Sequence, residues 1–272
     1  MLRIGQIEYA NCTPLFYLLK ERFPCSEYEF IKGVPTELNR LLELGEIDLC
    51  PSSSIEYALH SDQYRIIPEL SISSDGAVAS VLLFSKIPIE CLDGKTILLS
   101  SESATSVNLL KILMAQRFNC RCKYSVTTLP FAEALVDSEA LLLIGDAALR
   151  ASLANSDIHK YDLGTLWRDW TGLPFVFALW LCRSDVAGTP ELEELAGKLI
   201  KARDLLPLHY SEAAEKAPEA EWMGHDQLLK YWRENICYDL DENKIKGLSL
   251  FYEKCFELGL INSVPELKFS DS

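Results

Sequence analysis

The feature that most constrains the fold is an alternation of strand-like and helical segments that occurs in two successive blocks. In the first block, residues 2–7, 28–32 and 47–51 have the apolar pattern of strands, and helical segments begin near Pro14 and Pro35 between them. This alternation is typical of α/β proteins, in which helices cover a largely parallel sheet. We therefore expect an open α/β sheet in the first part of the chain.

The second block repeats the alternation after residues 86–94, where Pro88 and the turn pair Asp93-Gly94 indicate a crossing segment. Three further strands are expected, at residues 96–100, 123–127 and 140–144. The apolar segment 174–182 would then return the chain to the first sheet.

Two crossings between two α/β units predict two lobes joined by a hinge, with a ligand cleft between the lobes. We expect lobe I to be discontinuous, with residues 1–86 and 178–272, and lobe II to be the inserted segment 87–177. The predicted fold class is therefore a two-lobed α/β protein.

The charge of the chain excludes some classes of partner. Forty acidic and 26 basic side chains give a net charge of −14, which opposes binding to nucleic acid or to an anionic membrane. A small anion remains a suitable ligand, because backbone N–H groups and hydroxyls in a cleft can outweigh the overall field. The sequence also shows no apolar run of the ~20 residues that span a membrane and no signal-peptide pattern. We expect a cytoplasmic protein and leave its oligomeric state open, a homodimer included.

The nine cysteines are odd in number, and several lie in apolar segments, which indicates buried free thiols rather than a disulfide framework. The spacing of Cys120 and Cys122 is too tight for a usual zinc site and has no second pair. We expect neither a metal nor a cofactor.

Chemistry is expected at four junctions where a strand ends, hydroxyl or amide residues follow, and a helix begins: residues 9–14, 51–54, 100–106 and 144–146. Ligands of open α/β sheets gather at such ends, and helix N-termini suit carboxylates and phosphates. The alternative interpretation of each junction alone is an ordinary helix cap, since Ser, Thr, Asn and Asp are the preferred N-cap residues.

Asn11 and Ser80 are two further candidates. Asn11 precedes Thr13-Pro14, a pair expected to begin a helix, so its amide is free for another role. Ser80 lies in the apolar run 78–84, where a buried hydroxyl needs either a backbone partner or a ligand. The four histidines lie outside the four junctions, so a histidine base is disfavoured. Nucleophilic-triad, Walker and dinucleotide-binding patterns are absent from the sequence.

Several motifs in a fixed order carry a family resemblance: residues 4–14, 33–39, 53–57, 80–85, 103–106, 142–148 and 162–180. Together, over about residues 2–260, the chain resembles the chorismate dehydratase family of the futalosine route to menaquinone. The resemblance implies a fold like that of a type II periplasmic binding protein. It also implies a cytoplasmic carbon–oxygen lyase that converts chorismate into 3-[(1-carboxyvinyl)oxy]benzoate and water.

The resemblance also suggests roles for the candidate residues. Asn11 and Ser80 are expected to be catalytic, and a carboxylate of the substrate itself is expected to accept the proton. The expected substrate-binding residues, which would hold the carboxylates and hydroxyl of chorismate, are Ser53, Ser54, Thr105, Ser106, Gly145 and Asp146.

Two alternatives of different kinds remain open. The sister enzyme of the pathway, which forms 1,4-dihydroxy-6-naphthoate, shares the fold but carries a His-Glu pair where this chain has Gly145-Asp146. A second alternative is a protein of the same fold that binds a small carboxylate without chemistry.

Overall fold

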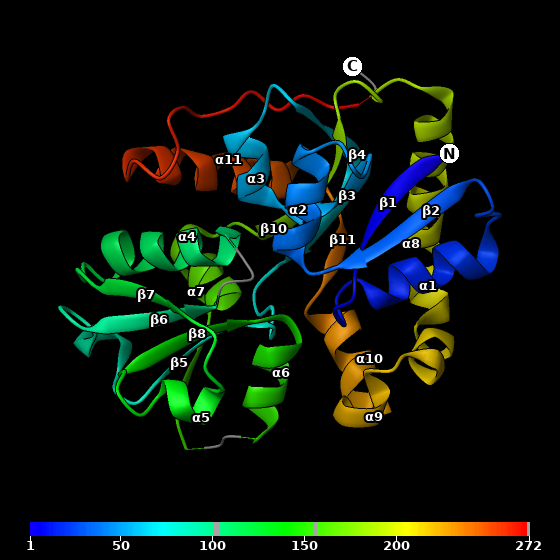
Figure 1. The fold of residues 1–272 in the computed structure, drawn as a ribbon. Coiled ribbons are helices and arrows are strands. Elements are labelled where there is room, and N and C mark those ends of the chain that lie inside the picture. The colour runs from blue at the N-terminus through cyan, green and yellow to red at the C-terminus, as the bar shows by residue number, and fades with distance from the viewer. Residues whose placement is uncertain (101–103, 155–156, 271–272) are drawn as a thin grey trace.

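A computed structural model describes residues 1–100, 104–154 and 157–270. Its strands form two separate sheets that lie side by side (Figure 1). In order across the first sheet, the strands are β11 (Cys237–Asp239), β4 (Tyr64–Ser74), β10 (Phe175–Arg183), β3 (Leu49–Ser53), β1 (Leu2–Ile7) and β2 (Tyr28–Gly33). In the second sheet they are β7 (Lys123–Thr127), β6 (Thr96–Ser100), β8 (Ala140–Ile144), β5 (Val81–Ser85) and β9 (His159–Asp162).

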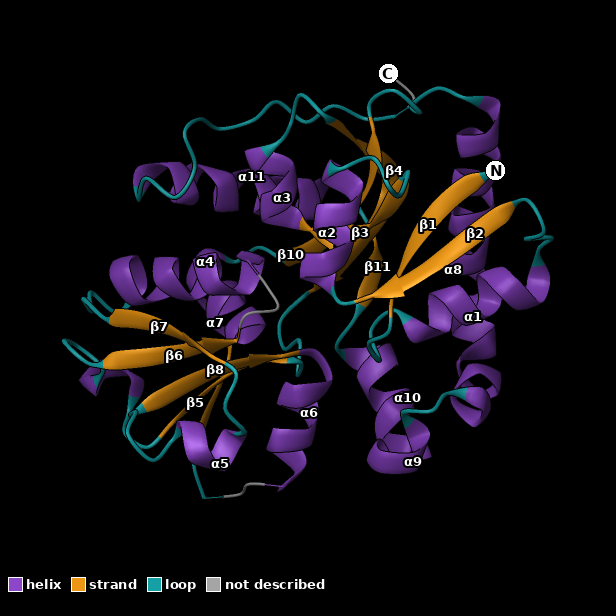
Figure 2. Ribbon diagram, viewed as in Figure 1, coloured by secondary structure: helices purple, strands orange, loops and turns teal. Residues whose placement is uncertain are grey.

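Helices pack around both sheets (Figure 2). Their bounds are α1 (Thr13–Arg22), α2 (Pro35–Glu43), α3 (Ser54–Leu59), α4 (Ala104–Ile112), α5 (Phe131–Ala134), α6 (Gly145–Ala154), α7 (Leu163–Thr171), α8 (Pro190–Lys216), α9 (Ala220–Met223), α10 (His225–Glu234) and α11 (Glu242–Glu257). Within the described part of the chain, none of these helices is both long and apolar enough to cross a membrane.

The two-lobed α/β fold expected from the sequence is confirmed. In each sheet, parallel strands are joined by helices: β1 pairs in parallel with β2 and β3, and β6 pairs in parallel with β7 and β8. Both sheets are completed by antiparallel strands, β10 in the first and β5 in the second. The sheets are therefore mixed rather than fully parallel.

The crossing between the sheets lies earlier than the sequence indicated. The strand β5, expected to close lobe I before residue 86, pairs with β8 and β9 and so belongs to the second sheet. The chain crosses over residues 75–80, where Gly76 and Ala79 adopt positive φ angles of 116° and 59°. The return also precedes residue 178, because the whole of β10 lies in the first sheet. Apolar Val78 and Ala79 resemble strand residues, and alanine gives no sequence signal for a positive φ.

The C-terminal part also differs from expectation. The sequence of residues 227–258 has the pattern of one amphipathic helical segment, but the structure has α10, the short strand β11 and α11 there. The strand β11 pairs with the edge strand β4. Three side chains of residues 231–238 donate hydrogen bonds to Ser80, Ala10 and Asn11, which lie near the space between the lobes.

An aromatic cluster joins the lobes on one side. Trp167 of α7 is fully buried, and its ring lies 5.2 Å from Phe175 of β10 and 6.5 Å from Phe251 of α11. Edge-to-face contacts of this kind stabilise packed aromatic rings. Trp167 thus fills space between the second lobe and the first rather than facing the pocket described below.

Candidate active site between the lobes

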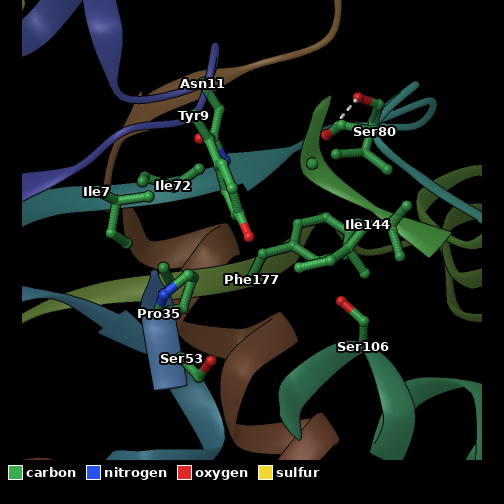
Figure 3. A pocket seen from close by; sticks show the side chains of 14 residues that line it. Ile7, Tyr9, Asn11, Pro35, Ser53, Ile72, Ser80, Ser106, Ile144 and Phe177 are labelled. Atoms are coloured by element: carbon green, nitrogen blue, oxygen red, sulfur yellow. Dashed lines mark hydrogen bonds between the residues drawn. The ribbon is translucent and has the colours of Figure 1, made fainter. Parts of the chain in front are cut away.

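A pocket that is partly open to solvent lies between the two lobes (Figure 3). It is lined by residues of both lobes and of the crossing segment: Ile7, Tyr9, Asn11, Pro35, Ser53, Ile72, Val78, Ser80, Val81, Ser106, Ile144, Gly145, Phe177 and Ala178. The first lobe supplies most of these residues, while Ser106 and Gly145 lie in the first turns of α4 and α6 in the second lobe.

This pocket is neutral in its described lining, which contains no acidic, basic or histidine side chain. Its polar groups belong to Tyr9, Asn11, Ser53, Ser80 and Ser106. An anion in this pocket would therefore be held by hydroxyls, amides and backbone groups. Apolar walls lower the local dielectric and strengthen each of these hydrogen bonds.

Asn11 lies in the turn before α1 and has one polar atom without a partner. Its backbone oxygen accepts a hydrogen bond of 2.8 Å from the Tyr238 hydroxyl. Its Oδ1 is buried and has no hydrogen-bond partner among the described residues. A buried unpaired amide oxygen costs about 1–3 kcal/mol, so this atom is available to a ligand that offers an O–H or N–H group.

Ser80 lies at the end of the crossing segment, directly before β5, and not within a strand as the sequence suggested. It is buried. Its Oγ accepts a hydrogen bond of 2.9 Å from the Tyr231 hydroxyl and donates a longer one of 3.3 Å to the Val78 carbonyl. The Ser80 carbonyl accepts from the Gly145 N–H at 2.7 Å. Ser80 is therefore bonded to both lobes.

Asp162, which sequence reasoning did not assign to the site, holds the crossing segment. Its carboxylate accepts from the N–H groups of Val78 at 3.1 Å and Ala79 at 2.6 Å, and it caps α7 through the Thr165 N–H at 3.0 Å. Gly164 is required beside it, since an added Cβ would lie 2.3 Å from the Gly76 carbonyl oxygen. The signal available in the sequence was an aspartate at the start of a helix, which by itself indicates only a cap.

Ser53 and Ser106 line the pocket from opposite lobes, at the end of β3 and in the first turn of α4. Both are buried. Part of the junction that contains Ser106, residues 101–103, lies outside the described residues.

Ser54 and Thr105, expected to bind substrate, contact each other instead. Their hydroxyl oxygens are 3.3 Å apart, across the boundary between the lobes. Ser54 donates to the Val176 carbonyl at 2.8 Å, and Thr105 Oγ1 accepts from the Ile55 N–H at 3.1 Å. Neither residue belongs to the described lining of the pocket. The Ile55 N–H at the start of α3, a helix N-terminus predicted to bind an anion, thus donates to the Thr105 hydroxyl in this structure.

Gly145 and Asp146 are also occupied by protein partners. Gly145 lines the pocket, but its N–H is bonded to Ser80. Its φ of 56° and the 3.0 Å between an added Cβ and the ring of Tyr9 explain the absence of a side chain there. Asp146 Oδ1 accepts from the Ala10 N–H at 3.0 Å. This bond connects α6 of the second lobe to the turn that holds Asn11.

The thiol and the phenols next to the pocket remain neutral. Burial raises the pKa of the Cys12 thiol and of the Tyr231 and Tyr238 phenols well above their ordinary values. These groups are therefore protonated at neutral pH and do not act as bases. Within the described residues, no cluster of three His, Cys, Asp or Glu side chains has the arrangement of a metal site.

The fold defines a class of protein: two α/β lobes with a pocket between them, the architecture of the periplasmic binding proteins. The alkanesulfonate-binding protein SsuA of Xanthomonas axonopodis, solved with bound MOPS, has a TM-score of 0.69 at 17% identity and covers 99% of this chain and 96% of its own. A protein of Archaeoglobus fulgidus has a TM-score of 0.79 at 22% identity, covering 96% and 98%. These similarities confirm the predicted fold.

Sequence comparison identifies the family within this class. Residues 2–257 match the menaquinone biosynthesis family, and this chain belongs to it. The chorismate dehydratase of Thermus thermophilus is 34% identical over 266 residues, covering 92% of this chain and 93% of its own. The chorismate dehydratase of Campylobacter jejuni is 28% identical, covering 94% and 98%. The resemblance drawn from the motifs is confirmed.

Proposed function

We propose that this protein is a chorismate dehydratase, a carbon–oxygen lyase that forms 3-[(1-carboxyvinyl)oxy]benzoate and water. The observation that carries the proposal is the buried Asn11 Oδ1, which has no partner among residues 1–100, 104–154 and 157–270 and lies in a pocket whose described lining is neutral. Two relatives that align along most of the chain bear this name. Nine free cysteines suit a reducing compartment, which supports a cytoplasmic location.

The reaction needs little from the protein beyond position. The ring proton beside the enolpyruvyl ether leaves, the neighbouring hydroxyl departs, and the ring becomes aromatic. Because the proton is vinylogous to the ring carboxylate, hydrogen bonds to that carboxylate stabilise the developing dienolate. The described lining offers no carboxylate or imidazole to accept the proton.

A carboxylate of the substrate therefore accepts the proton in this proposal, and the departing hydroxide takes that proton to become water. Asn11 holds the reacting groups in register, and Ser80 supports them by a hydrogen bond. Of the residues that the resemblance suggested as ligands, Ser53 and Ser106 retain that role here, because both line the pocket. Ser54, Thr105 and Asp146 are assigned to contacts between the lobes.

The test is to mix purified protein with chorismate alone and follow the products by chromatography and mass spectrometry. We expect an aromatic product that is lighter than chorismate by one water molecule, with no cofactor added. Binding without product would instead support a carboxylate-binding protein of the same fold. Indifference to chorismate with conversion of the cyclic futalosine derivative would support the sister enzyme.

A further inference from the structure

Three buried aromatic side chains from one C-terminal segment donate hydrogen bonds to the two candidate catalytic residues and to Ala10 beside one of them. The Tyr231 hydroxyl donates to Ser80 Oγ at 2.9 Å, and Trp232 Nε1 donates to the Ala10 carbonyl at 2.6 Å. The Tyr238 hydroxyl donates to the Asn11 carbonyl at 2.8 Å. Each of the three donor side chains is at most 4% exposed.

These contacts join parts of the chain that have different roles in the fold. Asn11 belongs to the first sheet's strand–helix junction, while Ser80 ends the crossing into the second lobe. Tyr231 lies in α10 and Tyr238 in β11, close to the middle of the molecule (Figure 1). One short segment thus fixes the separation of the two candidate catalytic residues.

At Ser80 the contact also sets the direction of the hydroxyl. Because Ser80 Oγ accepts from Tyr231, its own proton must go to another acceptor. The Val78 carbonyl at 3.3 Å lies beyond the usual O–H···O range of about 2.5–3.0 Å. A substrate oxygen in the pocket is a better acceptor. Burial raises the pKa of Tyr231, so its phenol remains a donor at neutral pH.

At Asn11 the contact fixes the backbone and leaves the side chain without a partner. The Tyr238 hydroxyl bonds to the Asn11 carbonyl, while Asn11 Oδ1 has no partner among the described residues. The main chain of Asn11 is thus held in place by Tyr238, while its buried side-chain oxygen carries the free-energy cost of an unmade hydrogen bond. This is the expected arrangement when a side chain is held ready for a ligand.

We propose that Tyr231 and Tyr238 are positioning residues for the dehydration, Tyr231 by directing the Ser80 hydroxyl to the substrate and Tyr238 by fixing Asn11. The proposal rests on the proposed chorismate dehydratase activity. Neither tyrosine is among the described residues that line the pocket, so both act through the residues that do.

The first test is a double-mutant cycle of Tyr231→Phe and Ser80→Ala. Loss of a directed hydrogen bond to a charged transition state should lower kcat roughly 10–100-fold, with KM changed less than about threefold. If Tyr231 acts through Ser80, then Tyr231→Phe should change kcat less than about twofold when Ser80 is already alanine. A purely structural role would lower kcat equally in both backgrounds and would overturn the proposal for Tyr231.

The second test compares Tyr238→Phe with Tyr57→Phe. Tyr57 is also fully buried, and its hydroxyl donates to the Glu266 carbonyl at 2.7 Å, away from the pocket. The Tyr57 hydroxyl also accepts from the Lys268 N–H at 2.7 Å, so Tyr57→Phe should lose at least as much thermal stability as Tyr238→Phe. Only Tyr238→Phe should lower kcat, roughly tenfold.

The outcomes separate this inference from the proposed function. A wild-type protein that forms no product from chorismate would end both. An active wild type in which Tyr231→Phe and Tyr238→Phe match Tyr57→Phe in kcat would end this inference and leave the proposed function standing.

Discussion

Two sets of polar groups occupy the space between the lobes, and the set that lines the pocket includes a buried atom for which the described residues provide no partner. In the first set, around the pocket, Asn11 Oδ1 is buried without a partner among the described residues. In the second set, Ser54 pairs with Thr105, and Asp146 pairs with the backbone of Ala10. Both sets occur at strand–helix junctions and use the same residue types. The hydrogen-bond partners of these groups, rather than their residue types, therefore indicate which groups can bind a ligand.

The largest expected effect follows from removing the unsatisfied amide. Asn11→Ala should lower turnover of chorismate at least ~10³-fold, because a preorganised hydrogen-bonding group at the reacting atoms is lost. Asn11→Asp should also abolish turnover, since it brings a negative charge to a dianionic substrate. Steady-state rates and thermal unfolding together provide the measurement. Near-normal turnover in either variant would remove Asn11 from the mechanism.

A smaller effect is expected from the contact between Asp146 and the turn that holds Asn11. Asp146→Ala removes the acceptor of the Ala10 N–H and should lower kcat roughly 10–100-fold, because the geometry of the neighbouring Asn11 loosens.

The matched control is Asp146→Asn, which keeps an oxygen at the same position and should recover most of that loss. If Asp146 instead binds the substrate through its charge, the asparagine variant would be as impaired as the alanine variant. That result would move Asp146 from the satisfied set to the pocket set.

Thr105→Val should affect stability more than catalysis. The substitution removes the hydrogen bonds that Thr105 Oγ1 makes with the Ile55 N–H and the Ser54 hydroxyl. It should lower the free energy of unfolding by about 1–3 kcal/mol. We expect kcat to change less than about threefold, because Thr105 is not part of the described lining of the pocket. Chemical denaturation and steady-state kinetics measure the two quantities. A selective rise of KM at unchanged stability would contradict this assignment.

The smallest expected effect concerns the buried thiols. Burial raises the pKa of Cys50, Cys182 and Cys255 to about 12. Since each pKa lies above the pH of any activity assay, these thiols are protonated below about pH 11 and do not react as thiolates. Alkylation of the native protein at pH 8 should modify the exposed Cys91 and leave turnover unchanged. Inactivation that chorismate prevents would place a cysteine in the site.

The regular parts of the fold were predictable from local pattern. The bounds of β1, β6 and β8 follow from short apolar runs, and those of β7 from a short run that includes tyrosine, valine and threonine. The crossing at residues 75–80 was not predictable in this way, because its conformation depends on Asp162, more than eighty residues later. An apolar run such as 77–85 carries no local sign that it must bend.

The site was predictable in residue type and only partly in arrangement. Asn11, Ser53, Ser106 and Gly145 line one pocket, as the strand–helix junctions suggested, and so does Ser80 of the apolar run 78–84. Sequence patterns could not separate them from Ser54 and Thr105, since the difference lies in a contact between chain segments about fifty residues apart. Tyr231 and Tyr238 gave no signal, because a buried tyrosine in an amphipathic segment is most often part of the core.

The most direct test of this account is a crystal structure with 3-[(1-carboxyvinyl)oxy]benzoate bound. We expect the product between the lobes, with the Asn11 side chain within hydrogen-bond distance of it and the Ser54–Thr105 and Asp146–Ala10 contacts intact. Product bound elsewhere, or held through the hydroxyls of Ser54 and Thr105 after these have separated, would contradict the division between groups that the protein satisfies and groups that it leaves for the substrate.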